Sequence, residues 1–197
     1  MYESEAINEM VLKSDMDNEM TILNFDKLNW FIIERNEEFG VRFRDSENPR
    51  IKQLKGIEIF KINPAWRFEA HFEPYELVKI VTSVTASGAI RDYPSHGAFI
   101  FKMNNHIYRL DPIRLPNNDG YLLIFGDMTN GEETYGGGRF LYVKKPMEDS
   151  TTIIDFNKSI NPPCAISEFF ACPLPPPQNR LPFKVTAGEK KYEGLKH

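Results

Sequence analysis

Hydrophobic and polar residues alternate strictly over residues 66–73, where Trp, Phe, Ala and Phe are separated by Arg, Glu and His. A period of two is typical of a strand with one buried and one solvated face. Apolar runs bounded by turn residues predict seven further strands, over residues 57–62, 77–84, 98–103, 106–115, 121–125, 138–143 and 151–156. Asn104 and Asn105 lie between two of these segments and predict a hairpin turn, because Asn tolerates a positive φ.

A three- and four-residue spacing of apolar residues precedes this region and predicts an amphipathic helix over residues 21–40. The spaced positions are Ile22, Phe25, Leu28, Phe31, Ile32 and Arg35. Trp30 and Ile33 widen the apolar side, and Gly40 suits the C-cap. We expect this helix to pack on the sheet.

Proline dominates the C-terminal part, where seven of the fourteen prolines lie between residues 162 and 182. Proline lacks the N–H that a central strand needs, so this part is predicted to be a rigid, extended wrap. Cys172, Leu174 and Leu181 favour packing on the chain's own sheet. Residues 173–177 alone would also suit a polyproline ligand of another protein, which leaves an interaction module open.

Together these patterns predict a mainly β fold: an antiparallel barrel-like or split-barrel sheet of about eight strands, an N-terminal helix packed on it, and a Pro-rich C-terminal wrap. We expect a flexible lead over residues 1–20, a single domain over 21–192 and a short tail over 193–197. The chain of 197 residues is long enough to bury a core.

Charge and composition narrow the classes of partner. A net charge of −4 gives no basic footprint for nucleic acid. No apolar run approaches the roughly 18 residues that a membrane span needs. Two cysteines do not make a disulfide framework, and the N-terminus lacks a secretory signal, so a cytoplasmic location is expected.

Residues 127–189 combine rigid Pro, permissive Gly and polar side chains, which predicts a site. If residues 138–143 and 151–156 form a hairpin, Arg139 approaches Asp155, and Glu133 lies on the same rim. A carboxylate pair beside an arginine suits acid/base catalysis, so these three are the candidate catalytic residues. The structural alternative is an Arg–Asp bridge that ties a loop to the barrel end. The candidate ligand-binding residues are Glu133, Tyr135, Gly137, Arg139, Asp155, Asn157, Asn161 and Asn179.

Gly136–Gly138 opens a strand and lacks a Lys-Ser/Thr ending, so it is not predicted to be a phosphate loop. A turn with positive φ, or the close approach of a ligand, fits better. Cys164 and Cys172 have no Cys or His neighbours at metal-ligand spacing, so no metal is expected. At least one thiol is predicted to be buried and inert, while a nucleophilic cysteine with His71 as base, and a disulfide, stay open.

Several strings resemble the bacterial and archaeal family catalogued as domain of unknown function 1684. They lie at residues 125–141, 155–157, 161–165, 172–177, 179–181 and 187–189. A weaker resemblance extends upstream, through residues 68–74 and 28–49, so the resemblance covers about residues 25–192. The family has no established activity, so the resemblance implies the fold and the position of a site and says nothing of a substrate.

The expected function is therefore binding of a small organic ligand at one end of a β-barrel, where barrels often bind. A hydrolase or lyase using Glu133, Arg139 and Asp155 is the enzymatic alternative. No cofactor is predicted, although a small antiparallel barrel would also suit a flavin by analogy of fold.

Overall fold

The computed structural model describes residues 9–35, 38–85, 88–114 and 120–194. The chain divides into two units, residues 1–54 and 55–197. Residues 1–8 of the predicted lead and 195–197 of the predicted tail lie outside the described residues. Each unit is built mainly from antiparallel strands.

The first unit is a three-stranded antiparallel sheet in the order β1-β2-β3, followed by one short helix. Its elements are β1 (Leu23–Phe25), β2 (Leu28–Arg35), β3 (Glu38–Asp45) and α1 (Pro49–Gln53). The predicted helix over residues 21–40 is therefore wrong. Aromatic and β-branched residues dominate this stretch and favour a pleated surface, and their three- and four-residue spacing did not produce a helix.

Cross-strand pairs hold this sheet together. Trp30 stacks on Phe43 with ring centroids 5.9 Å apart, and the Arg44 guanidinium lies 4.9 Å from the centre of the Phe31 ring. Gly40, expected as a helix cap, pairs with Ile33 in the middle of the β2–β3 ladder. Paired aromatic and apolar side chains are the units that stabilise a sheet, which explains the preference for strands here.

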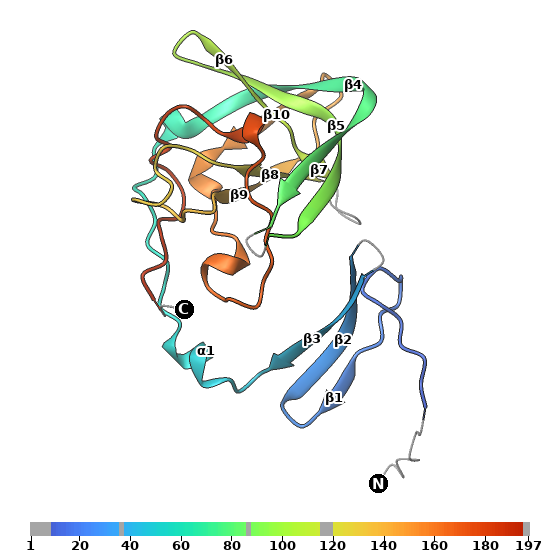
Figure 1. Cartoon of the computed structure of the whole chain (residues 1–197). Helices are drawn as coiled ribbons and strands as arrows, with labels where there is room; N and C mark the ends of the chain where they lie inside the picture. The colour runs from blue at the N-terminus through green and yellow to red at the C-terminus, as the bar shows by residue number, and fades with distance from the viewer. Residues whose placement is uncertain (1–8, 36–37, 86–87, 115–119, 195–197) are drawn as a thin grey trace. The chain divides into compact units, whose positions relative to one another are not determined.

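The second unit contains two antiparallel sheets, in the orders β10-β4-β5-β6 and β7-β8-β9. The first sheet curls into a half-barrel because β4 and β5 are long and bent (Figure 1). The strands are β4 (Arg67–Val84), β5 (Ile90–Met103), β6 (His106–Leu110), β7 (Ile113–Arg114), β8 (Gly120–Phe125), β9 (Arg139–Lys144) and β10 (Thr151–Asp155). Short 3-10 helices are η1 (Pro64–Trp66), η2 (Phe156–Lys158), η3 (Pro163–Ala165) and η4 (Pro177–Asn179).

The mainly β prediction is confirmed, with differences in detail. The predicted strands 66–73 and 77–84 are parts of the single strand β4, and the segment 106–115 is divided between β6 and β7. Residues 57–62 do not form a strand, and Ile59 makes only an isolated bridge to Glu189. The predicted hairpin turn is confirmed, since both Asn104 and Asn105 have positive φ, at 49° and 63°.

The bend of the half-barrel coincides with a change of register between β4 and β5. Pro74 pairs with Gly97, whereas Lys79 pairs with Ser95, so the β4 side carries extra residues. Such bulges bend a strand and increase its twist. A Cβ on Gly97 would lie 2.5 Å from the Glu73 carbonyl oxygen, so only glycine allows the two strands to approach at this point.

The core lies between the two sheets and is rich in aromatic rings. Phe99, Phe101, Phe125 and Phe156 are almost completely buried, and the rings of Phe101 and Phe125 both pack against Phe156. Edge-to-face contacts of this kind add to the stabilisation from burial. The core thus fixes the two sheets relative to each other within this unit.

The Pro-rich C-terminal part packs on the sheets of its own unit, as predicted. The Leu174 N–H donates to the Val84 carbonyl at 2.9 Å, and the Leu181 N–H donates to the Gly126 carbonyl at 2.7 Å. Leu181, Val185 and Ala187 are buried in the core. We call residues 159–192 the wrap.

Candidate functional site

Strands β9 and β10 do not form the predicted hairpin. β9 pairs with β8 and β10 pairs with β4, so the two strands belong to different sheets and face each other across an open seam. The prediction that pairing of these strands brings Arg139 to Asp155 is wrong for this reason.

Backbone groups of both strands point into the seam. Phe140 exchanges two hydrogen bonds of 2.9 Å with Ile160 on the side away from β8. Consecutive residues of a strand point their N–H and C=O groups to opposite sides. The groups of Tyr142, two residues after Phe140, therefore also point away from β8 and into the seam. In β10 the Thr151 carbonyl faces away from β4 and accepts from the Met147 N–H. The backbone N–H and C=O of Ile153, two residues later, therefore also point into the seam.

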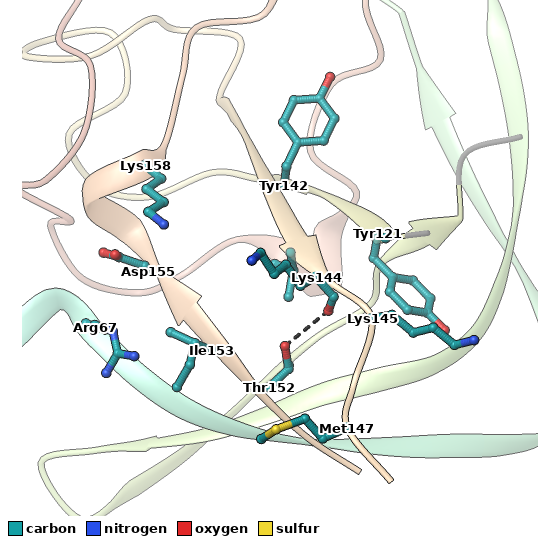
Figure 2. Close-up of a pocket in the computed structure, with 12 residues that line it drawn as sticks. Arg67, Tyr121, Tyr142, Lys144, Lys145, Met147, Thr152, Ile153, Asp155 and Lys158 are labelled. Atoms are coloured by element: carbon teal, nitrogen blue, oxygen red, sulfur yellow. Dashed lines mark hydrogen bonds between the residues drawn. The ribbon is translucent and has the colours of Figure 1, made fainter. Parts of the chain in front are cut away.

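A pocket of about 830 Å³ occupies the seam. Its lining comes from β4, β8, β9, β10, η2 and the β9–β10 connection: Arg67, Gly120, Tyr121, Tyr142, Val143, Lys144, Lys145, Met147, Thr152, Ile153, Asp155 and Lys158. The Thr152 hydroxyl donates to the Lys144 carbonyl at 3.1 Å, which links β9 to β10 at one point (Figure 2). The volume falls within the usual range for small-molecule sites.

Positive charge dominates the pocket. Four of its residues are cationic, namely Arg67, Lys144, Lys145 and Lys158, and Asp155 is the one acidic residue. Arg67, Asp155, Lys144 and Lys158 gather toward one part of the pocket, while Tyr121 and Lys145 lie toward the other (Figure 2). Within the described part of the chain, none of the four cations makes a salt bridge.

Asp155 is the one predicted site residue that lines the pocket. Its Oδ1 accepts from the backbone N–H and the side-chain amide of Asn157, at 3.2 and 2.9 Å, and so caps η2. The Asn157 amide in turn bonds the backbone N–H and C=O of Asn63, each at 3.0 Å. Asn157 therefore ties the cap of η1, which precedes β4, to the end of β10 and holds the carboxylate of Asp155 at the pocket.

Arg139 is buried elsewhere, beneath the wrap. Its Nη2 bonds Asp127 Oδ2 at 2.8 Å and the Val185 carbonyl at 2.9 Å, and its Nη1 donates to the Ala187 carbonyl. Both charged side chains are fully buried. Burial lowers the pKa of Arg139, and the facing Asp127 carboxylate opposes that shift. The predicted salt bridge of Arg139 to Asp155 or Glu133 is thus wrong: Asp127 is the partner, and the bridge has the structural role named above as the alternative.

Glu133 and Tyr135 lie apart from the pocket. The Glu133 carboxylate is at the surface, 3.6 Å from Lys184. The Tyr135 ring covers Gly137, where a Cβ would lie 2.5 Å from it. The third glycine of the run, Gly138, has φ +83° and faces Pro175, so positive φ and close packing by the wrap explain the triplet.

The two remaining asparagines bind backbone. Asn179 is almost fully buried, accepts from the Asp111 N–H and donates to the carbonyls of Asp111 and Ile124. The Asn161 amide donates to the Lys190 carbonyl at 2.8 Å. Both side chains thereby fasten the wrap to itself and to the sheets, and neither lines the pocket.

Both cysteines are buried, which confirms the predicted burial of at least one of them, while the predicted inertness stays a prediction. The Cys164 N–H lies 3.2 Å from Cys172 Sγ, and the Tyr135 hydroxyl lies 3.7 Å from Cys164 Sγ. The hydrogen bond from the Cys172 side chain, assisted by Tyr135, lowers the pKa of Cys164 to about 6. Burial raises the pKa of Tyr135 to about 12. The side chains that bond the Cys164 sulfur are thus Cys172 and Tyr135.

No three His, Cys, Asp or Glu side chains within the described part of the chain are grouped so as to hold a metal ion. No helix in that part of the chain has the length and apolar character required to cross a bilayer.

Sequence reasoning missed the cations and aromatic residues of the pocket. Lys144 ends the strand β9, Lys145 follows it, and Lys158 ends the short helix η2 that follows β10, which is the one signal the sequence contains. That signal becomes meaningful only when the two strands are known to face each other across a gap.

Comparison with known proteins supports the fold and identifies the family. The chain resembles the NMR structure of an uncharacterised protein of Haloarcula marismortui, with 28% identity and a TM-score of 0.59, over 72% of this chain and 80% of that one. No curated protein matches. The family model described as "Protein of unknown function (DUF1684)" matches residues 52–190, which covers most of the chain. The chain therefore belongs to the DUF1684 family.

Proposed function

We propose that the pocket in the β9–β10 seam binds a small organic anion. The observation that carries the proposal is the surplus of cations: Arg67, Lys144, Lys145 and Lys158 against Asp155, in a chain whose net charge is −4. Unpaired cations that converge on a concave surface attract anions more strongly than cations on an open surface, because the low-dielectric walls focus their field.

The lining also indicates the form of the ligand. Tyr121, Ile153 and Met147 offer apolar and aromatic surface to the pocket. The N–H and C=O groups that point into the seam from Tyr142 and Ile153 add hydrogen-bonding partners. A carboxylate or phosphate joined to a flat apolar group matches this combination, since small-molecule sites combine apolar walls with a few convergent polar groups.

Thermal unfolding in the presence of small carboxylates and phosphate monoesters tests the proposal. A ligand at 100 times its Kd stabilises the folded chain by about 2.7 kcal/mol, which raises Tm by several degrees. We expect the rise to shrink with increasing salt, because screening weakens the attraction. The double variant Lys144→Gln, Lys158→Gln is expected to abolish the rise.

Lys102→Gln is the matched control, because Lys102 is an exposed lysine of β5 that does not line the pocket. A Tm rise that persists in the double variant, or disappears equally in the control, contradicts the proposal. Failure of every anion to raise the Tm of the wild type also contradicts it.

A hydrolase or lyase built on Glu133, Arg139 and Asp155 is not favoured, because only Asp155 lies in the pocket. Asp155 contributes instead to the choice of ligand. It places a negative charge among the cations, so we expect Asp155→Asn to strengthen anion binding rather than weaken it.

A further inference from the structure

Cys164 and Cys172 lie close together at a place separate from the seam pocket. Cys164 lies in η3 and Cys172 lies eight positions later in the wrap, and both side chains belong to a small apolar cluster with Ile124 and Phe140. The Cys164 N–H points at Cys172 Sγ from 3.2 Å, and the two side chains hydrogen-bond each other. The folded chain therefore holds two thiols in contact.

From this geometry we propose that Cys164 and Cys172 are a peroxide-oxidised dithiol, with Cys164 as the attacking thiol and Cys172 as the resolving thiol. Two side chains favour the thiolate of Cys164 or its product. The Tyr135 hydroxyl, 3.7 Å from Cys164 Sγ, stabilises a negative charge on that sulfur. Cys172 is adjacent and ready to form the second bond.

The reaction balances with one peroxide molecule. The Cys164 thiolate attacks a peroxide oxygen, the O–O bond breaks, and the hydroxide that leaves becomes water on taking a proton. The Cys172 sulfur then attacks the sulfenic acid on Cys164, the S–O bond breaks, and a second hydroxide leaves and takes the proton of Cys172. The two thiols lose two electrons and the peroxide becomes two waters. A dithiol reductant reverses the change by exchange.

Burial selects the oxidant. Cys164 is 9% exposed and Cys172 is 6% exposed, so bulky thiol reagents are excluded from both sulfurs. Hydrogen peroxide is close to water in size and reaches a sulfur of this exposure. At pH 7 a thiol with pKa 6 has a thiolate fraction about thirty-fold larger than a free cysteine, which favours attack on peroxide.

Oxidation of the reduced full-length chain with one equivalent of hydrogen peroxide, followed by peptide mass mapping without reductant, tests the proposal. We expect an intramolecular Cys164–Cys172 disulfide in a monomer, formed with a rate that rises with pH around a midpoint near 6 and reversed by dithiothreitol. Disulfides between chains, or a sulfinic acid on either cysteine without a disulfide, overturn the proposal.

Variants separate the two roles. In Cys172→Ser, peroxide should leave a sulfenic acid on Cys164 that dimedone traps when the oxidised chain is unfolded in its presence, whereas Cys164→Ser should react with peroxide at least tenfold more slowly. Tyr135→Phe keeps the ring and removes the hydroxyl, so the midpoint of the rate profile should move to higher pH. Equal rates for the two serine variants, or an unmoved midpoint in Tyr135→Phe, contradict the assignment. Circular dichroism of each variant verifies that it is folded.

Discussion

Two polar regions of the second unit differ in how their charges are used. Beneath the wrap, Arg139 and Asp127 are fully buried and bonded to each other and to several backbone groups. In the seam, Lys144 and Lys158 lie around a pocket and make no salt bridge within the described residues. The charges with the most partners therefore hold the fold, whereas the seam cations, which make no salt bridge there, are the ones that we propose bind a ligand.

The largest effect that tests this contrast is expected at Arg139. Arg139→Met removes the cation, leaves the Asp127 carboxylate buried without its partner, and should cost about 3–5 kcal/mol of unfolding free energy. Urea denaturation followed by tryptophan fluorescence measures the loss. The control is Arg67→Met, an exposed arginine of the seam, which should change stability by at most about 0.5 kcal/mol. Similar losses in both variants would remove the contrast.

Gly138 tests whether the wrap requires close approach at the start of β9. Gly138→Ala places a Cβ 2.3 Å from Pro175 Cγ on a residue with φ +83°, so both strain and overlap oppose it. Gly131→Ala is the control, because Gly131 has φ +88° and open space around its Cβ position. The control should cost about 1–2 kcal/mol from backbone strain alone, and Gly138→Ala should cost about 1–3 kcal/mol more from overpacking. Equal losses of stability for the two variants in thermal unfolding would show that Pro175 moves to accommodate the added Cβ.

The pH dependence of stability tests the Cys164 thiolate under reducing conditions. The pKa of Cys164 falls from 9.0 to about 6 in the folded chain. Between these values the unfolded chain binds one proton more than the folded chain, so stability should rise with pH across this window and be lost as pH falls through 6. The measurement is the Tm difference between wild type and Cys164→Ser at pH values spanning the window. A constant difference would contradict the shift.

The smallest effect is expected at the seam. Lys144→Gln and Lys158→Gln each remove one of several neighbouring positive charges, so stability should change by no more than about 0.5 kcal/mol. The sign should be stabilising at low salt and should vanish at high salt, because screening removes the repulsion. Guanidinium is itself a salt, so urea is the denaturant for this measurement. A loss of more than 1 kcal/mol would mean that the lysines, like Arg139, hold the fold.

Local patterns predicted the parts of the fold that depend on local chemistry. The alternation over residues 66–73 and the Asn104–Asn105 turn are both where the sequence placed them, because side-chain alternation and positive φ are properties of single residues. The prediction of a helix over residues 21–40 was wrong, because apolar residues at three- and four-residue steps can also lie on both faces of a short sheet. The pattern does not report which neighbour each residue pairs with.

The prediction of the site failed because it depended on which strands pair over long distances in the sequence. Strands close in sequence usually pair, so β9 and β10 were expected to form a hairpin. They pair instead with β8 and β4, and β4 is more than 60 residues away in the sequence. Arg139 consequently meets Asp127, and the pocket is formed by residues that no motif connects. The wrap, in contrast, was predictable because proline and apolar residues recur together along it.

The open seam has a consequence for the exchange of amide hydrogens with solvent. The N–H groups of Leu141 and Val143 face β8, whereas that of Tyr142 faces the seam. Neighbouring amides of one rigid strand should therefore exchange at very different rates, with protection alternating from residue to residue. A molecule that fills the seam and accepts a hydrogen bond from the Tyr142 N–H would slow the exchange of that amide and erase the alternation. The exchange rates along β9 therefore measure whether the seam is occupied.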